Sequence, residues 1–253
     1  MSSRTYLPSE QLRTYVKRIV ISENEQKNTY KVLPDTSIVM GFQYSGTLCH
    51  QTDSGLKILN NAGVTGLSDK YKIFTNSDDI GTLLVVFTET GAATFLKCEL
   101  QELFSQSVSL DDMIIRSKMD IVTEQLQEAR NDSERVLVIE QFLTSSLTSL
   151  PRVAVVDAAV QLIKQTGGNI RVSSLAKQLY ISQSQLEKRF RRMVGASPKK
   201  FSSIVRLRSL LDNQNDTSNL THRGLEAGYY DQAHFIKDFR SMTGETPEAF
   251  FNK

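Results

Sequence analysis

The stretch that decides the fold reads YISQSQLEKRFRRMVGASPKKF over residues 180–201. A close copy, YYDQAHFIKDFRSMTGETPEAF, follows over residues 229–250. When residues 176–201 are aligned with residues 225–250, nine of 26 positions are identical, at a constant offset of 49 residues. Spaced identities of this kind are typical of a duplicated supersecondary unit, and two copies are too few for a solenoid array, which needs at least about three. The sequence therefore predicts two small units in tandem.

The first copy has the pattern of two helices joined by a tight turn. Ser182, with Gln185 three residues later, forms a capping-box pattern that opens the second and longer helix. Gly195 ends this helix, since glycine readily adopts the left-handed conformation found after a helix end. Two short helices around a tight turn are the layout of a helix-turn-helix unit.

The second copy repeats this layout after a connecting helix. Pro198 begins the connecting helix, which extends to about Asp212. A short helix near residues 220–227 follows, and Asp231 is the expected N-cap of a helix from Gln232 to Met242. Gly244 then ends this helix, and Pro247 begins the last one.

The charge of the chain is unevenly distributed. Residues 1–149 carry 14 Lys and Arg against 19 Asp and Glu, a net charge of −5, and residues 150–253 carry 16 against 9, a net charge of +7. The two values sum to the overall +2. An acidic half joined to a basic half favours two domains, of which the second meets a polyanion.

The outward faces of the two longer helices carry the residues that could read DNA. With Leu186 and Phe190 turned inward at helical spacing, the polar residues between them point outward. Long polar side chains on an exposed helix suit the major groove, where Lys and Gln can pair with purine edges. The candidate base-reading residues are Ser184, Glu187 and Lys188 in the first copy and Gln232, Ala233, His234 and Lys237 in the second.

Cations near these faces are candidates for contacts to phosphate. They are Arg191, Arg192, Lys199, Lys200 and Arg240. A face rich in Lys and Arg is also what an ordinary solvated helix presents. Charge alone therefore leaves both interpretations open, whereas the duplication, the capping and the charge together favour DNA.

Residues 153–251 resemble the C-terminal DNA-binding domain of AraC/XylS-type transcription regulators. The resemblance rests on residues of both copies that match the family pattern in type and in spacing. They are Leu175-Ala176, Ser182, Leu186, Phe190, Gly195, Pro198, Gly228-Tyr229, His234-Phe235, Phe239, Gly244 and Pro247. It implies two helix-turn-helix units joined by a long helix. It also implies that the second helix of each unit reads bases at the positions named above, and that Lys200 touches phosphate.

The chain departs from this family pattern at three positions. Arg223 and Gly224 stand where the family usually has an apolar residue and Ala, which predicts a looser first helix in the second unit, because a helical Gly costs roughly 1 kcal/mol relative to Ala. Glu187 repels phosphate, although its carboxylate could accept from the amino group of cytosine.

The N-terminal half is expected to be mostly β-structure. Residues 30–100 hold short β-branched or aromatic segments between turn residues such as Pro34-Asp35 and Ser45-Gly46, which predicts a compact β-barrel or sandwich. Two helices, roughly Asp111–Ala129 and Ser133–Leu147, come next. This order resembles full-length AraC-type regulators with a cupin-like sensing domain. The expected fold class is α+β, with a cupin-like β-barrel over 1–109, a helical linker or dimerisation hairpin over 110–149 and an all-α DNA-binding domain over 150–253.

Neither an enzyme nor a metal site is favoured by the sequence. A cupin metal site needs several histidines and a carboxylate, whereas the acidic half holds only His50, and the adjacent Cys49 would point to the opposite face of a strand. The sequence contains no Gly-x-Ser-x-Gly and no phosphate-cradling glycine loop. His234 could be a general base, but its place in the first turn of a reading helix favours a DNA contact or helix packing. We therefore predict no enzyme activity, no catalytic residue, no metal and no cofactor.

The two predicted linker helices carry apolar stripes. These comprise Ile121, Val122, Leu126 and Ala129 in one helix and Val136, Leu137, Ile139 and Leu143 in the other. The stripes can pack on the barrel or on each other, or they can pair two chains. Apolar residues of the barrel are expected to be core rather than effector contacts, so no effector residue is assigned: Met40, Phe42, Tyr44, Phe74 and Phe87.

The sequence also indicates where the protein acts. No apolar run approaches the ~20 residues needed to span a bilayer, and the N-terminal stretch lacks the apolar segment of a secretory signal. Two cysteines, Cys49 and Cys98, cannot form a disulfide framework. We expect a cytoplasmic protein with no membrane partner.

We therefore predict a sequence-specific DNA-binding transcription regulator. Its expected partners are double-stranded DNA, a small-molecule effector, a second copy of the chain and RNA polymerase. The alternative is a small-molecule-binding or catalytic barrel whose basic tail anchors nucleic acid without sequence preference.

Overall fold

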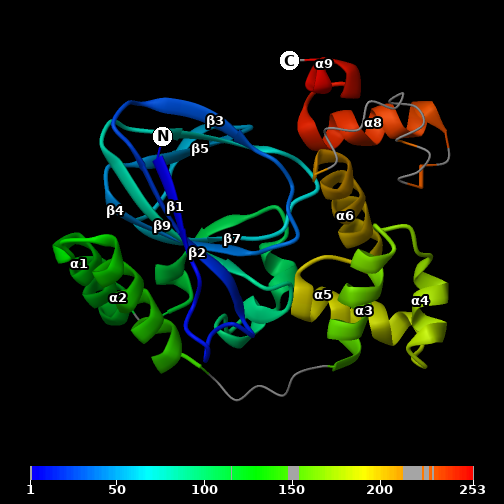
Figure 1. Ribbon diagram of the computed structural model, residues 1–253, viewed down its shortest axis with the longest axis horizontal. Helices are drawn as coiled ribbons and strands as arrows, with labels where there is room; N and C mark the ends of the chain where they lie inside the picture. Colours follow the sequence, from blue (N-terminus) through cyan, green and yellow to red (C-terminus); the bar gives the residue numbers. More distant parts are fainter. Residues whose placement is uncertain are drawn as a thin grey trace.

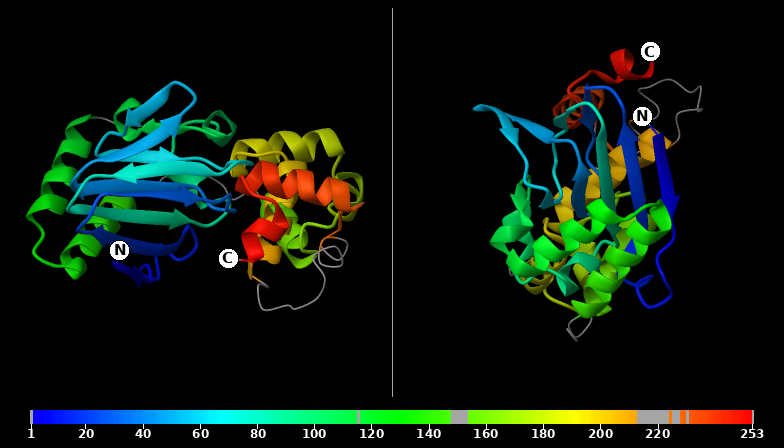
Figure 2. Two further views of the ribbon diagram at one scale, coloured as in Figure 1. Left: turned by 90° about the horizontal axis from the view of Figure 1, so that it is seen from above. Right: turned by 90° about the vertical axis from the view of Figure 1, so that its left-hand side faces the viewer.

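The structure, a computed structural model, describes residues 2–114, 116–147, 154–212, 224, 228–229 and 231–252. A β-rich part comes first, a helical hairpin follows, and the C-terminal part is helical (Figure 1). The hairpin and the C-terminal helices lie at opposite ends of the β-rich part (Figures 1 and 2). This arrangement confirms the α+β class expected from the sequence.

A six-stranded antiparallel sheet forms the larger layer of the β-rich part. Its strand order is β1 (Ser2–Tyr6), β2 (Val16–Asn24), β9 (Ile80–Phe87), β4 (Val39–Ser45), β7 (Ala62–Thr65) and β10 (Ser107–Ser109). The central strand β9 pairs with both β2 and β4, and Leu83 and Val85 on it are fully buried. Successive residues of a strand point to opposite faces, so these two side chains, two positions apart, share one covered face of the sheet.

A four-stranded antiparallel sheet forms the second layer. Its order is β3 (Asn28–Val32), β8 (Lys72–Asn76), β5 (Leu48–Thr52) and β6 (Gly55–Ile58). In the described part of the chain, no strand pair joins the two sheets, so two open sheets replace the expected closed barrel. One side chain of the second sheet bonds to the first sheet. The Lys72 ammonium, on β8, donates to the Gln106 carbonyl and to Ser107 Oγ, at the start of β10, each over 3.0 Å.

The helical hairpin covers the outer face of the six-stranded sheet. It consists of α1 (Arg116–Glu128) and α2 (Asp132–Ser145), and the ring of Phe142 meets that of Phe42 on β4 edge-on at 6.0 Å. Tyr6 Oη donates to Asp132 Oδ2 over 2.6 Å. The first helix begins later than the sequence predicted, because Leu110–Asp112 forms a separate 3-10 turn capped by Ser109.

Six helices are described in the C-terminal part: α3 (Ala154–Gln165), α4 (Val172–Gln178), α5 (Gln183–Val194), α6 (Pro198–Asp212), α8 (Gln232–Thr243) and α9 (Pro247–Phe251). The predicted short helix near residues 220–227 lies outside the described residues, apart from Gly224. Across the described ranges, no helix is long and apolar enough to cross a membrane.

The β-rich part and the first helix-turn-helix unit share one apolar core. Leu100 and Leu103, in the 3-10 helix η2 (Leu100–Leu103), belong to the same buried cluster as Val194 and Ala196 at the end of α5. Gly195 lies between them, and a Cβ there would come within 2.9 Å of the Leu100 carbonyl oxygen. The first unit is therefore packed directly against the N-terminal part.

Candidate nucleic-acid interface

The first helix-turn-helix unit is formed by α4 and α5. Ser182 caps α5, because its side chain accepts a hydrogen bond from the Gln185 amide over 3.3 Å. Gly195 ends the helix with a φ of 89°, in the left-handed region. Leu186, Phe190 and Val194 form its buried stripe. Both ends of the longer helix therefore lie where the sequence predicted them.

The predicted base readers of α5 lie away from this buried stripe. Ser184 and Lys188 are exposed, whereas Glu187 is partly covered. The Glu187 carboxylate accepts from Gln183 Nε2 over 3.0 Å and from Arg191 Nη2 over 3.3 Å. These two hydrogen bonds lower the pKa of Glu187, and the bond from Gln183 has the larger effect. Glu187 is thus engaged within the helix, and Arg191 compensates its charge.

The predicted phosphate contacts of the first unit differ in their surroundings. Arg192 and Lys199 are exposed, and Arg191 is exposed but paired with Glu187. Lys200, in the first turn of α6, instead forms an ion pair with Asp69 of the N-terminal part, with 2.8 Å between Nζ and Oδ2. Its ammonium also lies 4.1 Å from the centre of the Phe104 ring. The N-terminal part therefore occupies one expected phosphate contact.

The second unit presents its reading helix in the same way. Asp231 caps α8, because its carboxylate accepts from the His234 amide over 2.7 Å. Gln232, Ala233, His234 and Lys237, the four predicted base readers, are all exposed, and so is Arg240. Gly244 ends α8 with a φ of 82°.

The connecting helix α6 packs against the second unit in a separate apolar cluster. Ile204 and Leu207 of α6 are fully buried in the cluster that holds Phe235 and Phe239 of α8. The 15 residues of α6 span about 22 Å at 1.5 Å per residue. A helix of this length can hold two reading helices at a fixed separation.

The glycine that departs from the family pattern has a packing role. A Cβ at Gly224 would come within 2.8 Å of the Phe235 ring, so glycine allows the close approach to α8. Arg223, the other departure in this unit, lies outside the described residues. The close contact at Gly224 offsets part of the loss of helix propensity that the sequence predicted.

Ion pairs and hydrogen bonds tie the C-terminal helices to the N-terminal part. Lys31 of β3 donates to the Thr243 carbonyl over 2.9 Å and pairs with Glu245 at 2.7 Å, just after α8. Glu89, just after β9, pairs with Lys164 of α3 and with Lys17 of β2, each at 2.9 Å. Burial alone would raise the pKa of Glu89, but the two lysines hold it below its usual value.

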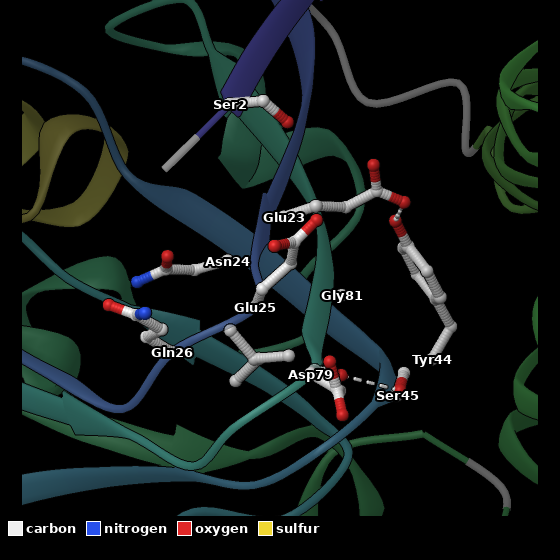
Figure 3. Close-up of a pocket in the computed structure, with 10 residues that line it drawn as sticks. Ser2, Glu23, Asn24, Glu25, Gln26, Tyr44, Ser45, Asp79 and Gly81 are labelled. Carbon is white, nitrogen blue, oxygen red and sulfur yellow. Dashed lines mark hydrogen bonds between the residues drawn. The ribbon is translucent and has the colours of Figure 1, made fainter.

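A polar pocket of about 630 Å³ lies at one end of the six-stranded sheet (Figure 3). Its lining includes the carboxylates Glu23, Glu25 and Asp79. Tyr44, which the sequence placed in the core, borders it, and its hydroxyl donates to Glu23 Oε1 over 2.8 Å. The hydrogen bond from Arg4, then that from Tyr44, lowers the pKa of Glu23. The other four predicted core residues, Met40, Phe42, Phe74 and Phe87, are buried.

His50 lies in β5 with its ring stacked 5.1 Å from that of Phe74. Burial lowers its pKa, and the charges of Lys72 and Lys57 lower it further. Within the described ranges, His, Cys, Asp and Glu side chains nowhere form a group of three suited to a metal ion.

Comparison with known families separates the two halves of the chain. Residues 175–253 match the family described as "Helix-turn-helix domain". Residues 4–109 match a "Domain of unknown function (DUF6597)". The helix-turn-helix match includes α5, α6, α8 and α9, and so it contains every residue predicted to contact DNA.

Known proteins resemble the chain in sequence or in fold. The Msm operon regulatory protein of Streptococcus mutans is 31% identical over 117 residues, which cover 45% of this chain and 42% of that protein. The structure is similar to ToxT from Vibrio cholerae, with a TM-score of 0.51 and 10% identity, over 100% of this chain and 98% of that one. ToxT bound to (E)-4-(8-methylnaphthalen-1-yl)but-3-enoic acid has a TM-score of 0.50 and 12% identity, with coverage of 100% and 99%. The match to the Streptococcus protein thus spans less than half of its length.

Proposed function

We propose that the chain is a transcription regulator of the AraC/XylS type, which binds a specific DNA sequence in the cytoplasm to control transcription. The observation that carries this proposal is the pair of capped helices α5 and α8, each with an exposed polar N-terminal face. The connecting helix α6, about 22 Å long, joins the two units, so their reading faces can meet adjacent major-groove segments about one turn apart.

In this proposal, direct reading of bases falls to the N-terminal faces of α5 and α8. Lys188 and Lys237 can donate to guanine O6 and N7, and Gln232 can pair with adenine. Ser184 and His234 add polar groups, and Ala233 offers a methyl contact to thymine. Glu187 can accept from cytosine only by giving up its bonds to Gln183 or Arg191, so it contributes less than Lys188.

Contacts to phosphate fix the protein on the duplex without reading its sequence. Arg192, Lys199 and Arg240 are exposed for this role. Arg191 must share its guanidinium with Glu187, and Lys200 must leave Asp69. DNA binding is therefore opposed by the ion pair that Lys200 makes with the N-terminal part.

Residues 1–109 are proposed as a sensing domain, 110–149 as a linker hairpin and 150–253 as the DNA-binding domain. The fold shared with a ToxT structure that holds a small carboxylic acid supports a small-molecule effector here as well. The shared core at Leu100 and Val194 and the pair between Asp69 and Lys200 give a physical route by which an effector could change DNA binding. Thermal-shift screening of the full chain tests this part.

Self-association is proposed through the helical hairpin. Most of the predicted apolar stripe packs inward: Val122, Leu126, Ala129, Ile139 and Leu143 are buried. Val136 is partly buried, whereas Ile121 on α1 and Leu137 on α2 are each 54% exposed. A second copy covering these two side chains would pair two DNA-binding domains and add avidity. We propose RNA polymerase as a further partner on the basis of the family resemblance alone.

Titration of the full chain with DNA tests the proposal. The full chain is required because α5 shares its core with the N-terminal part. DNA selected from a random pool by the chain should bind at least about 1,000-fold more tightly than unselected DNA. Binding of both DNAs with equal affinity would instead favour a tail that anchors nucleic acid non-specifically.

A further inference from the structure

Tyr180 displays its side chain in the turn between α4 and α5. It is 98% exposed, so almost none of the ring is buried against the described part of the protein. A tyrosine that contributed to the core of a helix-turn-helix unit would bury most of its ring. Packing within the chain therefore does not explain this residue.

The backbone at Tyr180 ends α4, because the Tyr180 amide donates to the Lys177 carbonyl over 3.2 Å and the Ile181 amide donates to the Ala176 carbonyl over 3.1 Å. The φ of Tyr180 is 52°, in the left-handed region, which glycine adopts freely and which bulky residues avoid. Among the described residues, the other non-glycine residues with positive φ are Asp79 and Ser105. Non-glycine residues held in such conformations gather at functional sites, where the strain accompanies a role in binding. The end of α4 thus requires a left-handed residue, and the chain has an exposed tyrosine there, where glycine would be unstrained.

The second unit shows how the same turn is built without strain. Its left-handed residue is Gly228, with a φ of 84°, and a Cβ there would come within 2.5 Å of Asn169. The tyrosine that follows, Tyr229, is only 4% exposed and packs its ring 5.2 Å from that of Phe235. The amides of Ile181 and Tyr229 each donate to the carbonyl five residues earlier, so Tyr180 has the place of Gly228 in the turn, and the second unit has no side chain there.

The place of Tyr180 indicates what it meets. It lies two residues before Ser182, the N-cap of α5. In helix-turn-helix proteins, the N-terminal end of the reading helix enters the major groove. The preceding turn then lies beside the phosphate backbone, and tyrosine hydroxyls are among the groups that bond phosphate oxygens.

We propose that Tyr180 is a DNA-backbone contact whose hydroxyl donates a hydrogen bond to a phosphate oxygen beside the segment that α5 reads. This assignment rests on the proposed function. It adds a contact in the turn to those on the helices. Because the contact goes to phosphate, it strengthens binding to all sequences alike.

Two substitutions separate the hydroxyl from the rest of the residue. Tyr180→Phe removes only the hydroxyl, and Tyr180→Gly removes the ring and relieves the left-handed backbone. In fluorescence-anisotropy titrations of the full chain with its selected DNA, each variant should bind about tenfold more weakly. The loss should be equal on unselected DNA, and the salt dependence should be unchanged, because neither substitution alters a charge.

Thermal unfolding and a control variant complete the test. Tyr180→Gly should melt at the native temperature or above it, so weaker binding cannot come from misfolding. Asp79→Gly is the matched control, since it also replaces a left-handed residue, at φ 51°, but in the N-terminal part. It should bind DNA as the native chain does.

Native affinity in Tyr180→Phe would overturn the assignment of the hydroxyl, and native affinity in Tyr180→Gly would overturn the DNA contact altogether. Failure of the proposed function would look different, because the native chain itself would then show no preference for its selected DNA. The two failures are therefore read from different measurements.

Discussion

Lys200 Nζ lies 2.8 Å from Asp69 Oδ2, so a residue at the start of α6 is paired with a loop residue 131 positions earlier in the chain. The Phe104 ring, 4.1 Å from the same ammonium, completes its surroundings. Lys200 is also the cation that the family resemblance places on phosphate. We therefore propose that DNA and the N-terminal part compete for the charge of Lys200.

Removing the competitor should strengthen DNA binding. In Asp69→Asn, Lys200 is released from its ion pair and becomes available to phosphate. Because both side chains are partly exposed, the pair contributes at most about 1 kcal/mol, which corresponds to a gain in affinity of up to about fivefold. Titration of selected DNA with the full-length variant measures this gain.

A double-mutant cycle identifies the partner. In a Lys200→Ala background, Asp69→Asn should change the affinity little, because the pair is already broken. Asp53→Asn, in the exposed turn between β5 and β6, removes a carboxylate elsewhere and should leave the affinity unchanged. An Asp69→Asn variant that binds DNA no more tightly than the native chain speaks against the competition.

Lys188 and Lys200 should differ in what they contribute. Lys188→Ala should cost about 1–3 kcal/mol on the selected site and relax the preference at one base pair. Lys200→Ala should weaken binding to every sequence and reduce the salt slope by about one unit. Affinities measured on single-base variants of the site at two salt concentrations separate the two roles, and identical behaviour would contradict them.

The exposed apolar residues of the hairpin should mediate pairing of two chains. The native chain is expected to sediment as a dimer at tens of micromolar, and Ile121→Glu and Leu137→Glu are each expected to sediment as folded monomers, because a buried unpaired carboxylate is costly. Leu56→Glu is the control, since Leu56 on β6 is 60% exposed and lies outside the hairpin. A native monomer, or an equal loss of pairing in Leu56→Glu, would refute this pairing.

The buried Lys72 should make stability depend on pH. Burial lowers its pKa from 10.5 to about 8. Between these values the unfolded chain binds more protons than the folded chain, so the native protein gains stability relative to Lys72→Met as the pH rises. Urea unfolding at pH 7.5 and pH 10 should show a gain of roughly 2 kcal/mol. A difference between the two proteins that does not change with pH would show that Lys72 titrates normally.

Short-range signals predicted the DNA-binding half well. Ser182, Gly195 and Pro198 mark helix ends through their own backbone and side-chain chemistry, so α5 and α6 begin and end close to where they were expected. Burial of Leu186 and Phe190 follows from helical spacing, and this spacing turns Ser184 and Lys188 outward.

Features that depend on distant parts of the chain were not predicted. The pairing of Asp69 with Lys200 has no periodicity, and β2 (Val16–Asn24), which pairs with β9 in the large sheet, precedes the region recognised as strands. Ile121 and Val122 belonged to one predicted stripe, but adjacent helical residues differ by about 100° in direction, so only Val122 reaches the sheet side. The left-handed conformation of Tyr180 was not predicted either, because glycine, and not tyrosine, is the usual signal for such a helix end.

The most direct test of the central claim is the affinity of the full chain for its selected DNA, relative to unselected DNA, across a range of salt concentrations. The two exposed reading faces and the cations around them predict a preference of at least about 1,000-fold at physiological salt, with affinity for both DNAs falling steeply as salt rises. Equal affinity for selected and unselected DNA at every salt concentration would contradict a sequence-specific regulator.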